Sequence, residues 1–575
     1  MAKEETFDVI IIGAGHNGTT TAAYLAKSGL SVCVLEERPE GGGAQETCEP
    51  IAGVRIQPHA IGMYGGSAPG FEQLELWRYG FRMDYNPRKP VPFDFGRGPM
   101  TRNGTETVSE EDGMGWAKLV GLNSAPPFYR DLLRATFWTP PHPSYIELDE
   151  NTIPYMQVYR DNLPELWTKE MLEWTMFDLM EQYIKSEPFI IHQAYIANVS
   201  GAFAHFPGVG VPALECVATV MPPAVADPVA SRGNMHGYYH ALFRCAVANG
   251  AIIKTCCPVE EIIIEHGRAV GVQLRDDATW GPKRVNARKA VISACHIKPT
   301  FQKLIGPKHL DAGIMQRVND LSLKGGSLHM THFLTKEQLR YRPQYIWPTH
   351  EEFNGGFYCM ENKEIYWKNL ECVLGRQENL DIPPEECMWG MVGSANYSPT
   401  QPQSTRPGLF VNGPLWIMVP TPEYNVDGID AMDETPEDKK KWQDYARSTL
   451  SCIVENLDDD NLVQIWSDSP REQEFRNTGM LGGSWYGTRC DRDEWWNERP
   501  LPEMSRYRVP DIDGLYLCHQ SAAHPGGLCL MAVGYNLMHI LIEDGVAEPG
   551  PWWYASPWYV PEEGKISAVP GQGKV

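Results

Sequence analysis

The sequence predicts an α/β fold whose parallel sheet is assembled from segments that lie far apart in the chain. Two observations carry this prediction. Residues 7–36 have the pattern strand, glycine turn, helix and second strand, and residues 514–542 have a short strand, a polar glycine turn and a long apolar stretch. With 575 residues, the chain exceeds the size at which one hydrophobic core keeps growing, so we expect two or more structural units.

The N-terminal segment has the residues of one complete βαβ unit. Phe7–Ile12 is a short, continuous, β-branched run, which is typical of a buried parallel strand. A glycine turn follows over residues 13–18, and residues 19–28 predict a helix. Residues 31–35 predict the next buried strand, which ends at Glu36. Together these elements predict a Rossmann-like domain.

The turn between the first strand and the helix suits a dinucleotide. Gly13 permits the tight turn, Gly15 lets the backbone approach a pyrophosphate, and Gly18 allows close packing of helix and strand. The pyrophosphate then lies at the helix N-terminus, where free N–H groups and the macrodipole favour negative charge. Glu36 can accept hydrogen bonds from ribose hydroxyls. Because the glycines follow a strand, open a helix and precede an acid, we favour a dinucleotide site over a tight turn without a ligand.

Two further segments favour FAD over NAD. Residues 38–45 follow the acid directly, and their glycine run lets a second loop approach the pyrophosphate while Arg38 supplies a cation. An ordinary flexible loop is the alternative. Near the other end of the chain, the turn over residues 519–527 follows a strand and precedes an apolar helix. Its helix N-terminus would stabilise negative charge on a reduced isoalloxazine, and a closing helix without a ligand is the alternative.

With these residues, the chain resembles the phytoene desaturase-like flavoproteins, in particular the pyridine nucleotide-disulphide oxidoreductase domain 2-like branch. The matching stretches are Asp8 to Gly18, Val34 through Ala44, Gly53 to Gly62, Ala290 to Ala294, Gly479 through Gly487, and Gly514 to Cys518 with His524-Pro525-Gly526-Gly527 and Gly534. The chain departs from the family at His519-Gln520, at Trp485-Tyr486 and at Leu528-Cys529. These departures leave the substrate and the reaction open.

The resemblance implies a discontinuous FAD-binding domain of the glutathione reductase/amine oxidase type with an inserted α+β substrate domain. The expected FAD domain comprises residues 1–75, 231–300 and 500–548, the substrate domain comprises residues 76–230 and 301–499, and residues 549–575 form a C-terminal tail. The resemblance also implies that the backbone at Val259 contacts the adenine and that Ser293-Ala294 closes the sheet beside the cofactor. The predicted cofactor-binding residues are Gly13, Ala14, Gly15, Asn17, Gly18, Glu36, Glu37, Arg38, Gly42, Gly43, Ala44, Gln45, Val259, Ser293, Ala294, His524, Pro525, Gly526, Gly527 and Leu528.

Catalysis by hydride transfer to a flavin needs a base only if a proton also leaves the substrate. The candidates for such a base are His59, His524, Tyr486 and Tyr535. A structural histidine is the alternative for His59, and a helix-cap role is the alternative for His524. The segments between the FAD-binding stretches are rich in Trp, Tyr, Pro and Met, which suits a pocket for a small apolar substrate as well as a core with irregular loops.

Composition excludes several classes of protein. The formal net charge of −23 disfavours nucleic acid as a partner. The 14 cysteines show no zinc or iron–sulfur spacing, so we expect no metal site and a reducing, cytoplasmic location. The N-terminus carries acids where a secretory signal is basic, and no stretch of about 18 apolar residues occurs. The aromatic tail could pack on the body, contact another copy of the chain in a homo-oligomer, or make peripheral contact with a membrane.

Three functions fit the sequence. The first is an FAD-dependent dehydrogenase or desaturase that acts on C–C bonds of an apolar, isoprenoid or alicyclic substrate and passes electrons to an unidentified acceptor. The second is a redox-neutral hydratase or isomerase that keeps the flavin reduced. The third is a flavin-binding scaffold without catalysis.

Overall fold

The computed structural model describes most of the chain. The described residues are 5–60, 69–85, 93–94, 98–99, 109–119, 129–144, 153–165, 168–199, 204–210, 229–231, 234–323, 327–340, 342, 356–358, 362–376, 379–387, 389–392, 404–422, 435–484, 486–489, 494–526, 531–563 and 565.

The first sheet is built from segments of the two ends and the middle of the chain. Its order is β10-β11-β12-β1-β2-β9, and β18 also pairs with β12. The strands are β1 (Glu5–Ile12), β2 (Val32–Leu35), β9 (Ile252–Lys254), β10 (Val259–Glu265), β11 (Arg268–Leu274), β12 (Arg284–Ser293) and β18 (Leu515–Leu517). Strand β1 pairs in parallel with β12 and β2, and β18 and β9 extend this parallel part at either side. Strands β10 and β11 add an antiparallel hairpin.

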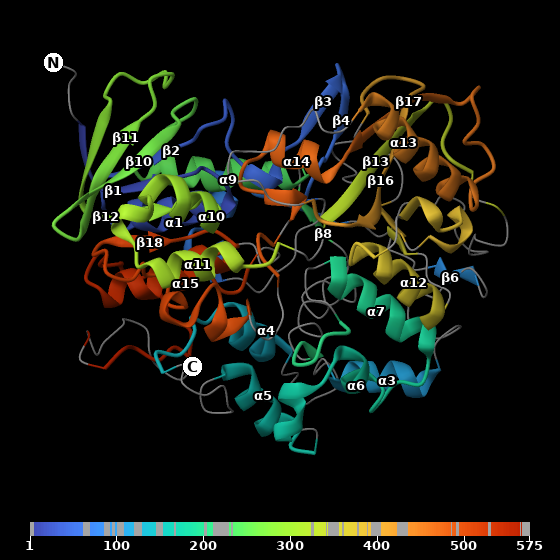
Figure 1. Cartoon of the computed structure of the whole chain (residues 1–575), viewed down its shortest axis with the longest axis horizontal. Coiled ribbons are helices and arrows are strands. Elements are labelled where there is room, and N and C mark those ends of the chain that lie inside the picture. The colour runs from blue at the N-terminus through green and yellow to red at the C-terminus, as the bar shows by residue number, and fades with distance from the viewer. Residues whose placement is uncertain are drawn as a thin grey trace.

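Helices cover both faces of this sheet, which explains the continuous apolar run of β1. Val9 and Ile11 face a core shared with the helices α1 (His16–Lys27), α9 (Asn234–Ala248) and α15 (Ala532–Glu543). Ile10 and Ile12 face a second core with α10 (Ile297–Pro299), the π-helical turn η4 (Thr300–Ile305) and α11 (Ala312–Asp320). The predicted α/β, Rossmann-like fold is therefore confirmed, and it lies at one end of the molecule in Figure 1.

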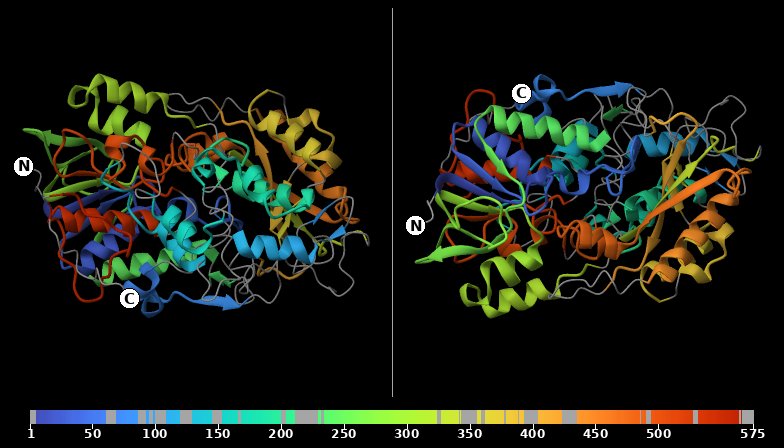
Figure 2. Two further views of the ribbon diagram at one scale, coloured as in Figure 1. Left: turned by 90° about the horizontal axis from the view of Figure 1, so that it is seen from below. Right: turned by 90° about the horizontal axis from the view of Figure 1, so that it is seen from above.

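A second sheet lies at the opposite end of the molecule, as the two views of Figure 2 also show. It is antiparallel, in the order β14-β15-β16-β13-β17. Its strands are β13 (Ser327–Thr335), β14 (Gly356–Tyr358), β15 (Trp389–Val392), β16 (Phe410–Val419) and β17 (Leu462–Asp468). One face packs on α13 (Pro436–Ser451) through a core that includes Leu415, Ile417 and Leu450. Helix α13 begins with a capping box between Thr435 and Asp438, which accounts for the acidic start of this segment.

Short helices fill the space beside the second sheet and below it in Figure 1. They are α3 (Glu110–Leu119), α4 (Tyr129–Phe137), α5 (Pro154–Asn162), α6 (Met176–Met180), α7 (Glu187–Val199), α12 (Lys363–Val373) and α14 (Pro470–Arg476). The remaining elements are α2 (Pro69–Gln73), β3 (Cys48–Ile51), β4 (Val54–Ile56), β5 (Met83–Tyr85), β6 (Phe93–Asp94), β7 (Gly98–Pro99) and β8 (Val229–Ser231). None of the helices in the described part of the chain has the length and apolar character needed to cross a bilayer.

The tail over residues 549–563 packs on the helices that cover the first sheet. Trp553 lies against Tyr24 of α1 and Tyr535 of α15, with ring centroids 5.5 and 5.1 Å apart. Arg506 donates to Glu543 over 2.7 Å, and Tyr559 joins the same carboxylate. Packing on the body is thus the observed arrangement among the three that the sequence left open, while a contact with another copy of the chain and a membrane contact stay predictions.

Candidate cofactor site

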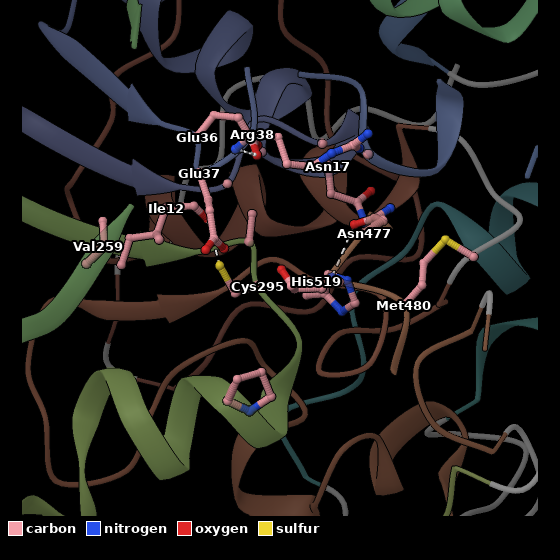
Figure 3. Close-up of a pocket in the computed structure, with 18 of the residues that line it drawn as sticks. Ile12, Asn17, Glu36, Glu37, Arg38, Val259, Cys295, Asn477, Met480 and His519 are labelled. Atoms are coloured by element: carbon pink, nitrogen blue, oxygen red, sulfur yellow. Dashed lines mark hydrogen bonds between the residues drawn. The ribbon is translucent and has the colours of Figure 1, made fainter. Parts of the chain in front are cut away.

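A cavity of about 540 Å³ lies along the carboxyl edge of the first sheet. Its wall comes from the β1–α1 turn, the loop after β2, the start of β10, residues 294–304, residues 474–481, and the pair His519-Gln520 after β18. Figure 3 draws Val259 and Glu36 toward one end of the cavity and Met480 and His519 toward the other. The cavity therefore joins both glycine-containing turns that the sequence analysis identified.

The N-terminus of α1 opens into this cavity. Gly15 is the N-cap residue, and no side chain caps the helix, so the N–H groups of its first turn are available to a ligand. Two buried atoms of this turn, Nε2 of His16 and Oδ1 of Asn17, have no hydrogen-bond partner among the described residues. The helix dipole, the free N–H groups and Nε2 of His16 as a donor fit a diphosphate, whereas Oδ1 of Asn17 can accept a hydrogen bond from a hydroxyl.

The glycines of the turn have separate steric roles. Gly13 has φ +99°, a conformation that favours glycine. A Cβ on Gly18 would lie 2.2 Å from the carbonyl oxygen of Gly13, so no larger residue fits without movement of the backbone. A Cβ on Gly15 would meet only the Cα of Gly43, at 4.0 Å, which leaves space for a ligand between the two loops. The turn therefore packs tightly behind and stays open in front.

Glu36 supports the turn as well as lining the cavity. Its Oε2 accepts a hydrogen bond from the Ala14 N–H at 2.7 Å, and its Oε1 accepts one from the Arg38 N–H at 2.9 Å. Burial raises the pKa of the Glu36 carboxyl despite these two bonds. A carboxylate accepts about four hydrogen bonds, so two lone-pair positions remain for ribose hydroxyls.

The second glycine loop is hydrogen-bonded to the first. The N–H of Gly42 donates to the carbonyl of Ala14 at 2.9 Å, and Gly42 and Gly43 have φ values of +112° and +57°. Gly43 and Ala44 line the cavity, whereas Gln45 closes the loop by donating its N–H to the carbonyl of Gly42. The loop thus forms the wall opposite the helix N-terminus.

A buried network of charges anchors this loop to the second sheet. Glu46 forms ion pairs with Arg38 and with Arg476 of α14, and Arg476 pairs in turn with Asp468 of β17. His59 lies fully buried with Nε2 3.1 Å from Oε1 of Glu46. Burial alone would raise the pKa of Glu46, but His59 and Arg38 outweigh it and lower that pKa to about 2. Arg38, predicted as a cation for the diphosphate, is therefore paired with Glu46 while it lines the cavity.

The end of the cavity near β18 holds buried groups whose pKa values are shifted by burial. Burial lowers the pKa of His16 to about 4 and that of His519 well below its usual value. His519 Nδ1 lies 2.8 Å from Oγ of Ser521. Burial raises the pKa of Glu474 to about 7, and its Oε2 accepts a hydrogen bond from the Gly482 N–H at 2.5 Å. Glu474 is thus a carboxyl group that can hold or release a proton near neutral pH.

The predicted catalytic residues do not line this cavity. His524 is buried, with Nε2 2.7 Å from the carbonyl of Thr136 and its ring centroid 4.1 Å from that of Trp496. Tyr535 donates its hydroxyl to the carbonyl of Tyr554 at 3.1 Å, and Tyr486 is buried in the aromatic core. His59 belongs to the charge network instead. The roles of these four residues stay predictions.

The predicted cofactor-binding residues fall into three groups. Those that line the cavity are Gly13, Gly15, Asn17, Gly18, Glu36, Glu37, Arg38, Gly43, Ala44, Val259 and Ala294. Those that support its wall or lie near it without lining it are Ala14, Gly42, Gln45, Ser293, His524, Pro525 and Gly526. Gly527 and Leu528 lie outside the described residues.

Sequence reasoning missed several cavity residues. These are His16, Cys295, Glu474, Asn477, Met480, His519 and Gln520. His519 and Gln520 were noted only as departures from a family pattern. Glu474, on α14, lies five residues before Gly479, where one of the stretches that resemble the family begins. The position of that stretch is the signal from which Glu474 could have been predicted.

Two family models match the chain in the segments that form the first sheet. The model described as FAD dependent oxidoreductase matches residues 8–47, and the model described as GMC oxidoreductase matches residues 223–300. The first match covers the βαβ unit and the second glycine loop. These segments of the chain are thus similar to the FAD-dependent oxidoreductases. FAD is thus the dinucleotide of this flavoprotein.

Curated relatives match over almost the whole length of the flavoprotein. The rat protein named pyridine nucleotide-disulfide oxidoreductase domain-containing protein 2 is 24% identical over 94% of each chain. One of the subunits of limonene dehydrogenase from Castellaniella defragrans is 23% identical over 95% of this chain and 96% of that protein. These relatives confirm the resemblance to the domain 2-like branch.

Solved structures show the same fold. Putrescine oxidase aligns with a TM-score of 0.55 and 15% identity over 94% of this chain and 100% of that chain. An oxidoreductase from Methanosarcina mazei aligns with a TM-score of 0.53 and 16% identity over 93% and 99%. The discontinuous α/β architecture of this flavoprotein is therefore shared with these oxidoreductases.

Proposed function

We propose that this flavoprotein is a dehydrogenase that forms a C=C bond in a small, largely apolar substrate. The observation that carries the proposal is that Glu474, which lines the cavity together with His16 and His519, has a pKa that burial raises to about 7. Removal of a hydride and a proton from adjacent carbons requires a proton acceptor, and a carboxyl group that titrates near neutral pH can serve as one. The similarity to a limonene dehydrogenase protein supports an alicyclic or isoprenoid substrate.

The residues of the chain have distinct tasks in this proposal. Bound FAD supplies the hydride acceptor. The first turn of α1 and the second glycine loop hold the diphosphate, and Val259 lies at the end where the adenine is expected. Glu474 takes the proton that leaves with the hydride, so that the substrate loses two hydrogens and gains a double bond. An external acceptor, of a kind still to be identified, must then take the electrons in each turnover.

Two buried histidines, His16 and His519, line the cavity. Burial lowers the pKa of His16 to about 4 and that of His519 well below its usual value. At neutral pH each ring therefore has one N–H that can donate a hydrogen bond and one nitrogen lone pair that can accept one. Such groups orient a neighbouring polar atom without requiring a charged substrate. An apolar substrate meets no unpaired charge from these rings.

Anaerobic mixing of the oxidised holoprotein with limonene and a panel of alicyclic and isoprenoid hydrocarbons tests the proposal. We expect at least one of them to bleach the flavin absorbance and to yield a product with one more double bond. Glu474→Gln should slow the bleaching strongly, while Glu472→Gln, on the same helix, should leave it unchanged because Gln preserves the capping box at Ser469. Turnover that requires a prereduced flavin would instead support a redox-neutral isomerase or hydratase, and no reaction with any compound would favour a scaffold.

A further inference from the structure

A cluster of metal-binding side chains lies behind the second glycine loop, at helix α9. Glu40 belongs to the loop, while His236 and His240 are four residues apart on α9 and therefore share one face of the helix. The ligand atoms of the three side chains all lie within 4.8 Å of one another. The centroids of the two imidazole rings are 4.4 Å apart. The three residues thus meet the distance requirement for one shared ion.

The two ring nitrogens of His236 have different partners. Its Nδ1 lies 3.1 Å from the carbonyl oxygen of Gln45, so Nδ1 carries a hydrogen and donates it. In the neutral ring, Nε2 then bears a lone pair, yet it lies 2.7 Å from Oε1 of Glu40, which also bears lone pairs. One metal ion held by both atoms would satisfy the lone pairs of Nε2 and Oε1 together.

We propose that Glu40, His236 and His240 bind a divalent transition metal, of which Zn²⁺ best suits two imidazoles and a carboxylate. The bond from Nδ1 of His236 to the Gln45 carbonyl is the kind of outer bond that orients histidine ligands in metal sites. The Glu40 side chain is 60% exposed, so it can move outward to reach Zn–O and Zn–N distances of about 2.0–2.1 Å. Water completes the coordination.

The charges around the cluster are compatible with a metal. Arg38, two residues before Glu40, is paired with Glu46. The guanidinium of Arg244, four residues after His240, donates to the carbonyl of Tyr79 at 3.3 Å. Both guanidinium groups thus have partners other than Glu40.

A metal at this position would fasten the second glycine loop to α9. A Cβ on Gly42 would lie 3.4 Å from Nδ1 of His236, and one on Gly41 would lie 2.0 Å from the hydroxyl of Tyr239, so the loop already lies directly on the helix. The adjoining Gly43 and Ala44 line the cofactor cavity. We therefore expect bound Zn²⁺ to slow the release of FAD, a consequence that rests on the cofactor site but not on the proposed reaction.

Calorimetric titration of the tag-free, chelator-treated holoprotein with Zn²⁺ tests the proposal, together with anomalous diffraction of soaked crystals at the zinc edge. We expect one saturable site and an anomalous peak between Glu40, His236 and His240. The double variant His236→Ala/His240→Ala should bind Zn²⁺ about 100-fold more weakly or worse, because loss of even an outer partner costs about 10–100-fold. His309→Ala, which removes a histidine outside the cluster, should bind as the unaltered protein does.

The outcomes separate a metal site from a simple ion pair. If the double variant does not fold, the anomalous map of the unaltered protein still decides the question. A peak elsewhere, or the absence of any peak at the three side chains, would overturn the proposal and leave His236 and Glu40 as a contacting pair without a metal. Flavin reduction by substrate is measured separately, so failure of the dehydrogenase proposal leaves the metal result intact.

Discussion

The two glycine-containing turns of this flavoprotein come from similar sequence patterns but contribute differently to the site. The first turn, over residues 13–18, presents a helix N-terminus to the cavity and is hydrogen-bonded to Glu36 and Gly42. The second turn, over residues 519–527, contributes His519 and Gln520 to the cavity, while the His524 ring packs in the aromatic core beside Trp496. A pattern of strand, glycine turn and helix thus predicts the backbone, but the packing behind the turn decides which residues meet the ligand.

The charge network that anchors the second glycine loop, residues 38–45, should give the largest effect. In Glu46→Ala, Arg38 loses its partner and Arg476 loses one of two, in a largely buried setting. Removing one partner from a buried ion pair typically costs about 3–5 kcal/mol, so we expect a loss of that size in the free energy of unfolding. Denaturant unfolding of holoprotein and variant measures it. A loss below about 1 kcal/mol would mean that the second glycine loop does not depend on this anchor.

The pH dependence of stability follows from the same carboxylate. The folded-state pKa of Glu46 is lowered from 4.5 to about 2, so its contribution is present above 4.5 and disappears as the pH falls through 2. As the pH falls from 4.5 to 2, the free energy of unfolding should therefore decrease less for Glu46→Ala than for the unaltered protein. Equal slopes for the two proteins in this interval would contradict the assignment.

Alanine substitutions in the two turns compare them directly. In Gly18→Ala, the new Cβ meets the Gly13 carbonyl at 2.2 Å, so we expect a destabilisation of about 1–3 kcal/mol and loss of most bound flavin. In Gly526→Ala, φ is +91° and the nearest atom is 3.4 Å away on Arg499, so we expect about 1–2 kcal/mol from backbone strain with the flavin retained. Flavin content after gel filtration decides between them. If both variants lost the same amount of flavin, the turn over residues 519–527 would lie as close to the cofactor as the turn over residues 13–18.

Glu474 should show opposite effects on stability and on chemistry. Its folded-state pKa is raised from 4.5 to about 7, so the folded state gains stability as the pH falls from 7 toward 4.5. Above pH 7, Glu474→Gln should be more stable than the unaltered protein by about 1–2 kcal/mol, because no charge remains to be buried. Thermal unfolding across this pH range measures the difference. A variant that is less stable at every pH would show that Glu474 is a structural carboxylate.

The histidines of the second turn should give the smallest effects. His519→Gln changes a residue that lines the cavity, so we expect an altered flavin absorbance spectrum or reduction potential with little change in stability. His524→Gln should cost about 1 kcal/mol through the bond to Thr136 and leave the flavin spectrum unchanged. Titration of the reduction potential and denaturant unfolding separate the two. A shifted spectrum for His524→Gln would restore it as a cofactor contact.

Local patterns account for the part of the structure that the sequence predicted. The continuous β-branched run of β1 and the glycines of its turn predict strand, turn and helix because each residue acts on its own backbone. The second side of the cavity depends on the docking of α14, which brings Glu474 to the site, and that docking is set by contacts with the second sheet. The pairing of Glu46 with Arg476 joins residues that no local period relates. No local period relates Glu40 to the histidines of α9 either. A search for metal sites through cysteine spacing therefore could not find this group.

The segment over residues 515–543 completes a fold that begins about 500 residues earlier in the chain. The hydroxyl of Thr21 on α1 lies 3.0 Å from the sulfur of Cys518, and α15 covers α1 over a surface that includes Gly534 and Thr20. During translation, the apolar side of α1 has no such cover until residues 515–543 have left the ribosome. The nucleotide-binding fold therefore stays incomplete while residues 37–514 are synthesised, and the yield of the protein in a cell will depend on what shields that surface meanwhile.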